Sequence, residues 1–137
     1  MTLIILYVTS FVIFLGIDFL GLGYIVKPVF DRHIGHLLLE DIRIFPAFAF
    51  YAFYVVVLLW FVSYPALAQD KSLLWVAGNA ALLGAAAYGT YEFTSLAVMK
   101  DWSWSMVATD LTWGTFLTAA TAVGGVWLTR MFTASLA

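Results

Sequence analysis

Four long apolar stretches, separated by short polar segments, constrain this chain more than any other feature. We place them at about residues 3–26, 44–68, 73–99 and 104–131 of the 137-residue sequence. As helices, each can cross about 30 Å of hydrocarbon at a rise of about 1.5 Å per residue. With 64% hydrophobic and 10% charged residues, a soluble fold of this length could not hide its apolar surface. The sequence therefore predicts a single-domain, all-α, integral membrane four-helix bundle.

The first connection, residues 27–43, is the only long polar segment. Its apolar residues recur at helical spacing on one side: Phe30, Ile34, Leu37 and Leu38. This pattern is typical of a short interfacial helix in the headgroup plane, so we expect the first membrane helix to end at Lys27-Pro28. The residues expected at headgroup level are Lys27, His33, His36 and Lys100.

The basic residues predict how the bundle is oriented. The first and third connections lie on one side of the membrane and carry Lys27, Arg32, Arg43 and Lys100. The other side carries Lys71 and Arg130. Because basic residues are enriched in cytoplasmic loops, we expect the first and third connections in the cytoplasm and both termini outside it.

Three carboxylates interrupt the apolar stretches: Asp18, Glu92 and Asp110. Asp18 lies eight residues before the end of its predicted span, which is roughly 12 Å into the membrane. Glu92 and Asp110 each lie about one and a half turns inside their spans, so all three are displaced toward the first and third connections. A charge inside a span costs about 2.5 kcal/mol or more, so such residues usually face the bundle interior or a cavity.

The third and fourth spans are joined by a short turn, which predicts antiparallel neighbours. Small residues recur every fourth position in the third span, at Ala77, Ala81, Ala85 and Gly89. A matching row in the fourth span comprises Asp110, Gly114, Thr118 and Ala122. Because small residues let helices approach closely, we expect Glu92 and Asp110 to lie within reach of each other. Such a pair should not carry two full charges near pH 7.

The two acids have possible hydrogen-bond donors one helical turn away, Tyr88 for Glu92 and Trp113 for Asp110. The predicted polar cluster, a possible ligand site, comprises Asp18, Tyr88, Tyr91, Glu92, Thr94, Asp110 and Trp113. Three interpretations of the acids stay open. They fix the helix register, they line a cavity for a proton, an ion or a lipid headgroup, or they reach the interface.

Other kinds of chemistry find little support. The chain has no cysteine, which excludes disulfides, thiolate nucleophiles and Cys-ligated metals. His33 and His36 stand three residues apart, but in a headgroup-level helix we expect them to be solvated, so we predict no metal and no cofactor. No Ser–His–Asp arrangement is legible, so the sequence does not favour an enzyme. A net charge of −2 gives no basic patch for nucleic acid.

Several motifs resemble a family of small bacterial inner-membrane proteins known only as predicted membrane proteins of unknown function. They are Asp18, Lys27-Pro28, and residues 35–38, 88–95, 100–102 and 110–115, so the likeness covers nearly the whole chain. The family more usually has Asp-Leu-Thr-Asn where this chain has Glu92-Phe-Thr-Ser95, which keeps the acid but lengthens it. The resemblance implies a four-helix protein of the bacterial inner membrane, whose termini the basic residues would place in the periplasm. It implies no reaction.

Three classes of function remain. The sequence favours a non-enzymatic accessory or packing subunit, surrounded by membrane lipids and associated with a larger membrane complex or with its own copies. The second class is a small transporter or channel that uses Asp18, Glu92 and Asp110 for a proton or cation. The third is a protein that binds or modifies a lipid headgroup near His33, His36 and Lys100.

Overall fold

The computed structural model describes residues 1–136, with side chains through residue 134. The described chain is helical and contains no strand. Its elements are α1 (Thr2–Gly21), η1 (Leu22–Val26), α2 (Lys27–Ile34), η2 (Gly35–Leu37), α3 (Ile44–Leu58), η3 (Leu59–Ser63), α4 (Tyr64–Ala68), α5 (Leu73–Val98) and α6 (Trp104–Leu136). Four continuous helical stretches are long and apolar enough to cross a membrane: Thr2–Leu37, Ile44–Ala68, Leu73–Val98 and Trp104–Ala134. The predicted all-α membrane fold is therefore confirmed.

The first helix does not end at Lys27-Pro28, as the sequence had suggested. It continues through α2 and η2 to Leu37. Proline lacks the N–H that would bond the carbonyl four residues earlier, and its ring clashes with that carbonyl. Here the carbonyl belongs to Tyr24, in the middle of η1, a π-helical turn that opens the backbone where the ring must fit. The headgroup position of residues 27–43 stays a prediction.

The second membrane helix accommodates a proline in the same way, with a π-helical turn before it. The π-helical turn η3 precedes Pro65, and the carbonyl four residues before Pro65 belongs to Phe61, in the middle of that turn. Both prolines therefore stand inside long helices without ending them. A proline in a membrane helix is tolerated where such local adjustments satisfy the freed backbone groups.

The two short turns of the bundle are also built alike. Asp70 and Asp101 adopt left-handed backbone conformations, with φ of 51° and 67°, just after α4 and α5 end. Two residues later, the Ser72 hydroxyl accepts a hydrogen bond from the Trp75 N–H at 3.1 Å, and Ser103 accepts one from Met106 at 3.2 Å. An aspartate that tolerates positive φ, followed by a serine N-cap, is a sequence signal for a tight reversal between helices.

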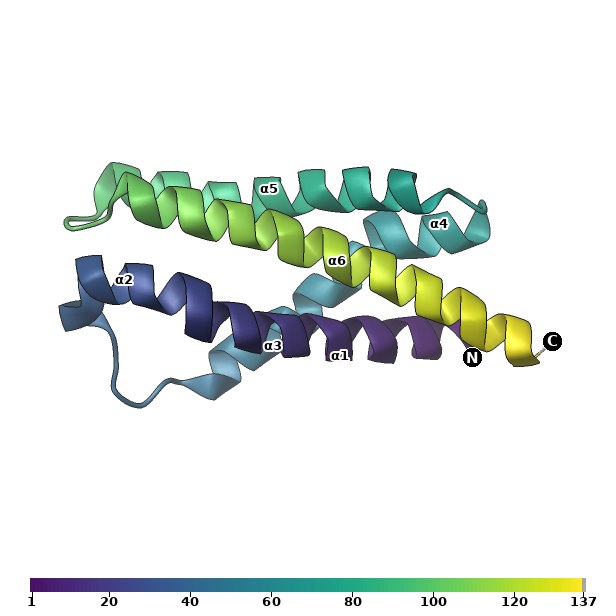
Figure 1. Cartoon of the computed structure of the whole chain (residues 1–137). Coiled ribbons are helices and arrows are strands. Elements are labelled where there is room, and N and C mark those ends of the chain that lie inside the picture. The colour runs from purple at the N-terminus through teal and green to yellow at the C-terminus, as the bar shows by residue number, and fades with distance from the viewer. Residues whose placement is uncertain (137) are drawn as a thin grey trace.

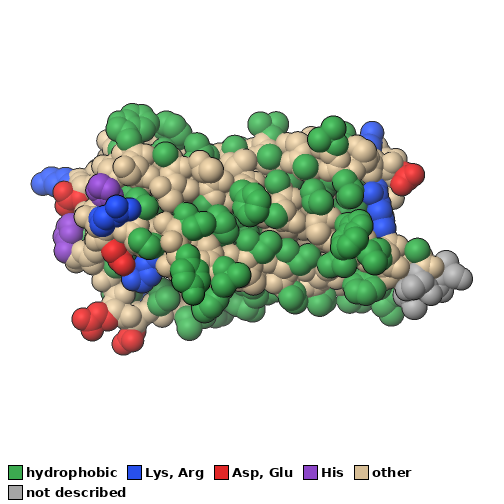
Figure 2. Space-filling view, viewed as in Figure 1, with side chains coloured by type: hydrophobic (Ala, Val, Ile, Leu, Met, Phe, Trp, Pro, Cys, Tyr) green, Lys and Arg blue, Asp and Glu red, His purple; other side chains and the backbone are tan. Residues whose placement is uncertain are grey.

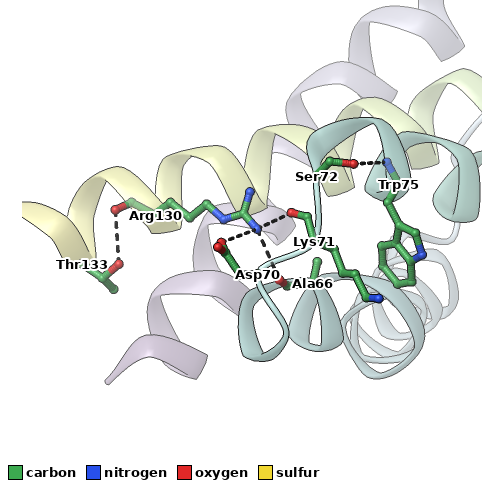
Figure 3. Close-up of polar contacts among 7 residues, drawn as sticks. All are labelled: Ala66, Asp70, Lys71, Ser72, Trp75, Arg130 and Thr133. Atoms are coloured by element: carbon green, nitrogen blue, oxygen red, sulfur yellow. Dashed lines mark hydrogen bonds and ion pairs between the residues drawn. The ribbon is translucent and has the colours of Figure 1, made fainter.

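The turn between α4 and α5 is tied to α6 by Arg130 (Figure 3). Its guanidinium donates to the carbonyls of Lys71 at 2.6 Å and Ala66 at 3.2 Å, and it lies 3.8 Å from the Asp70 carboxylate. Carbonyls at a helix end lack helical partners, so this arginine completes the end of α4.

α6 is the central helix and packs against α5, α1 and η3. Figure 1 shows the two termini and the α4–α5 turn at one end of the bundle, which we call the terminal end. Residues 38–43 and 99–103 lie at the other end, the connection end. Charged side chains gather at the two ends, and the visible face between them shows hydrophobic side chains among backbone and uncharged groups, with no charged side chain in view (Figure 2). This distribution suits a bundle that crosses a membrane.

Candidate functional site

A large pocket opens at the connection end because α3 stands apart from the rest of the bundle there. Residues 44–50 of α3 are all exposed, whereas Tyr54, Val55 and Leu58 are buried in the core. The wedge between the first turns of α3 and the other helices forms a cavity of about 1250 Å³. Its walls come from α1, η1, α2, the 38–43 connection, α3, α5 and α6.

Two of the predicted acids lie at the inner end of this pocket. Asp18 on α1 and Asp110 on α6 both line it, and their exposed fractions are only 3% and 7%. Neutral donors contact Asp18: the Trp113 indole N–H reaches its Oδ1 at 3.3 Å, and the Tyr51 hydroxyl also hydrogen-bonds to it. The two carboxyl groups are close enough to interact electrostatically, so the pocket ends in two neighbouring buried acids.

Glu92, the third acid, is fully buried and does not line the pocket. The Trp102 indole donates to its Oε1 at 3.0 Å, while its Oε2 has no hydrogen-bond partner within the described part of the chain. The Asp110 carboxyl lies beside Glu92 and interacts with it electrostatically. The predicted proximity of the two acids is therefore confirmed. Two carboxyl groups can share a hydrogen bond only when one of them carries a proton.

Aromatic side chains form much of the pocket wall. They are Phe30 of α2, Phe50, Tyr51 and Tyr54 of α3, and Tyr88 and Tyr91 of α5. The rings of Tyr54 and Tyr88 meet edge to face at 6.3 Å. Tyr54 also anchors α3 to α6, because its hydroxyl lies 2.9 Å from Thr118 Oγ1 at the point where α3 leaves the bundle.

Two glycines make room for the aromatic groups beside the acids. A Cβ atom on Gly21 of α1 would overlap the Trp113 ring, and one on Gly114 of α6 would overlap the Tyr88 ring. Glycine is the residue that permits so close an approach. The indole can therefore reach Asp18, and Tyr88 can lie flat against α6 beside the pocket.

The rim of the pocket carries charge of both signs. Lys27 and Asp31 form an exposed ion pair at 2.7 Å, and Glu40 of the 38–43 connection also lines the pocket. His36, which does not line the pocket, contacts Asp101 at 3.1 Å. This contact fastens the end of the first helix to the α5–α6 turn.

The structure gathers most of the predicted cluster but changes its partners. Trp113 donates to Asp18 rather than to Asp110, and Trp102, rather than Tyr88, supplies the donor to Glu92. Thr94 is exposed, and its hydroxyl bonds to backbone carbonyls of its own helix, so it does not join the cluster. The sequence analysis assigned no role to Tyr51 and Tyr54, because the second span contains no charged residue and many aromatic ones. Two tyrosines three residues apart in a span without charge were the available signal.

The imidazoles do not come together as a metal pair with a carboxylate. Across residues 1–136, no group of three His, Cys, Asp or Glu side chains is placed to hold a metal ion. The arrangement instead offers buried carboxylates and phenol groups at the base of an apolar, aromatic pocket. Such a site combines a large apolar contact area with a few polar groups that orient a ligand.

Comparison with known families places the chain among integral membrane proteins. The family described as "Predicted membrane protein (DUF2177)" matches residues 3–127. The chain belongs to this family. No curated protein and no solved structure matched the chain. Membership agrees with four helices capable of crossing a membrane and leaves the activity to be argued from the site.

Proposed function

We propose that this membrane protein binds an amphiphilic molecule of lipid-like size in the pocket between α3 and α5. The observation that carries the proposal is the cavity of about 1250 Å³ with two buried carboxylates at its inner end. Pockets for small molecules usually measure about 300–1,000 Å³, so this one suits a larger or elongated ligand. Its largely apolar wall suits the body of the molecule, and Asp18 and Asp110 suit a polar group.

The route into the pocket supports a ligand that arrives through the lipid. Ala47 and Phe50 of α3 and Ala87 of α5 line the pocket and are exposed. These residues lie within membrane-spanning stretches, so this side of the pocket would meet lipid rather than water. An apolar molecule dissolved in the bilayer could therefore enter sideways between α3 and α5.

This proposal favours the lipid-binding class over the other two. The accessory-subunit role stays a prediction, because nothing in the geometry identifies a partner surface, and the same holds for association with further copies. We also propose that the protein lies in a bacterial inner membrane with both termini in the periplasm. The basic residues at the connection end support this orientation. A cysteine replacing Lys71 should then be labelled from the periplasmic face and one replacing Lys100 from the cytoplasmic face; labelling from one face would overturn it.

The binding proposal can be tested by filling the pocket. Ala87→Phe places a ring on the pocket wall, while Ala86→Phe places the same ring at an exposed neighbouring position that does not line the pocket. Native mass spectrometry of protein extracted in mild detergent should show bound amphiphile in the wild type and in Ala86→Phe. Ala87→Phe should lose most of it. Equal retention by all three proteins would exclude this pocket as the binding site.

A further inference from the structure

No ion pair with a basic side chain is found for the acids at the pocket, Asp18, Asp110 and Glu92, in the described part of the chain. The ion pairs found in the described part of the chain join Lys27 to Asp31, His36 to Asp101 and Arg130 to Asp70. None of them involves Asp18, Glu92 or Asp110. The donors to Asp18 and Glu92 are an indole or a phenol, which carry no positive charge. A positive charge in the pocket would therefore be strongly favoured.

The aromatic wall of the pocket also favours a positive charge. Aromatic faces attract cations, and the attraction strengthens where water is excluded. The phenol groups of Tyr51 and Tyr88 lie close to the acids, Tyr51 beside Asp18 and Tyr88 near Asp18 and Asp110. Tyr54 extends this aromatic wall through its ring contact with Tyr88. Carboxylates surrounded by aromatic rings provide two independent attractions for an organic cation.

An anionic ligand would meet the opposite conditions. Lys27 is the one basic residue that lines the pocket, and it is paired with Asp31 at the rim. A negatively charged headgroup would face Asp18 and Asp110 inside and Asp31 and Glu40 at the mouth. Like charges brought together in a binding interface repel each other, so this arrangement favours a cation over an anion.

The neighbouring carboxyl groups of Glu92 and Asp110 add a titratable proton to the site. Glu92 and Asp110 are buried neighbours, and two adjacent buried carboxyl groups disfavour double ionisation, so the pair holds one proton between them. The titratable groups that face the pair are Asp18 on α1, Tyr51 on α3, and Tyr88 and Tyr91 on α5. At the rim, Lys27, Asp31 and Glu40 complete the set. A cation beside Asp110 would stabilise its carboxylate form and remove the need for the shared proton.

We propose that the ligand of this pocket is an apolar organic cation, held between Asp18 and Asp110 against the tyrosine rings, and that its binding releases the proton shared by Glu92 and Asp110. This inference rests on the proposed function, because it assigns a chemical class to the occupant of the same pocket. The charge balances: one cation enters, one proton leaves to solvent, and the charge of the site is unchanged. The released proton comes from the carboxyl pair and passes out through the pocket mouth.

The test compares two probes of nearly equal shape and opposite charge, tetraphenylphosphonium and tetraphenylborate. Binding is measured by equilibrium dialysis with purified protein in dodecyl maltoside near neutral pH. The phosphonium should bind saturably at one site, and the borate should not. Asp18→Asn and Asp110→Asn should each weaken phosphonium binding at least about tenfold. Asp41→Asn removes an exposed carboxylate at the same end that does not line the pocket, so it should leave binding unchanged.

Proton release is measured on the same samples with a pH indicator in weakly buffered solution. We expect close to one proton for each phosphonium bound by the wild type and by Asp41→Asn. Glu92→Gln should release far less, because its amide can donate to Asp110 and still accept from Trp102 without a shared proton. Phosphonium binding without proton release in the wild type would overturn the exchange.

The outcomes distinguish a failure of the cation assignment from a failure of the proposal that the pocket binds an amphiphile. The borate or a neutral amphiphile could bind to the wild type and not to Ala87→Phe, while the phosphonium binds to neither. In that case the pocket binds amphiphiles, but the cation assignment is wrong. If no probe binds and no amphiphile co-purifies, both proposals fail. The wild-type comparison of the two probes decides the sign of the charge even if an aspartate variant does not fold.

Discussion

The two ends of the bundle use small residues for opposite purposes. Where the helices pack closely between the middle of the bundle and the terminal end, a region that we call the closed half, a Cβ atom on Gly84 of α5 would lie 2.7 Å from Thr118 Oγ1 and 2.8 Å from the Gly114 carbonyl oxygen of α6. Gly125 of α6 approaches Ser10 of α1 in the same way. At the connection end, the small side chains of Ala47 and Ala87 line a cavity instead. A small side chain permits close packing where helices converge, and it widens the space where they diverge.

The largest expected effect comes from adding the same bulk at both kinds of position. Gly84→Leu should destabilise the protein by about 3 kcal/mol, because the added side chain meets the backbone of α6. Ala87→Leu, three residues later on the same helix, should change stability little while reducing the pocket volume. Thermal unfolding in detergent measures both, and Gly78→Leu is the control, since nothing lies within 4 Å of a Cβ at Gly78. Equal melting temperatures for Gly84→Leu and Ala87→Leu would contradict the contrast between the two ends.

A related variant tests the row of small residues that the sequence predicted on the third span. Ala77, Ala81, Ala85 and Gly89 are only half-buried, while Val76, Ala80 and Gly84, one position earlier, are buried. The closest approach to α6 is thus displaced by one residue from the predicted face. Ala85→Leu should therefore destabilise the protein less than Gly84→Leu does.

Most of the fold could be predicted from the lengths of the apolar stretches and from the short polar turns between them. Three predicted spans agree with the helices Ile44–Ala68, Leu73–Val98 and Trp104–Leu136 to within a few residues. Pro28 misled the prediction of the first helix, because a local rule ends helices near prolines and cannot foresee the π-helical turn that accommodates one. The short turn between the third and fourth spans, with the small-residue rows and the similar depth of the two acids, also predicted that Glu92 and Asp110 lie close together.

The pocket could not be predicted in the same way. It exists because α3 diverges from the bundle over residues 44–50, and the tilt of a helix is set by packing along its whole length. Once α3 diverges, Tyr51 faces Asp18 and becomes part of the site. In the sequence, Tyr51 is one aromatic residue among many in an uncharged span, so its role depends on a contact across two helices.

Stability at the connection end should depend on one buried hydrogen bond. Trp102→Phe removes the donor to Glu92 Oε1 and leaves a fully buried carboxyl group without it, at a cost of about 2 kcal/mol. The matched control is Trp104→Phe, because Trp104 is 67% exposed. Adding Glu92→Leu to Trp102→Phe should recover much of the loss, since replacing both partners by apolar groups removes the unmet acceptor. A double variant less stable than Trp102→Phe would show that Glu92 is held mainly by other contacts.

The smallest effect is expected at the boundary between the two halves, where Tyr54 joins α3 to α6. Thr118 Oγ1 donates to the Gly114 carbonyl at 2.7 Å, so the Tyr54 hydroxyl must be the donor in its 2.9 Å contact with Thr118. Tyr54→Phe keeps the ring contacts with Phe14 and Tyr88 and removes only this hydrogen bond. The expected loss of stability is about 1 kcal/mol.

Tyr64→Phe is the control for this change, because Tyr64 is 47% exposed on the same helical stretch. Hydrogen exchange should show faster opening of residues 44–53 in Tyr54→Phe than in Tyr64→Phe, while α5 and α6 exchange at unchanged rates. This result would show that Tyr54 restrains residues 44–53 of α3, the segment that forms one wall of the pocket. If exchange increased equally throughout α3 and α6, the two halves would unfold as one unit, and the divergence of α3 would be a fixed feature of the fold.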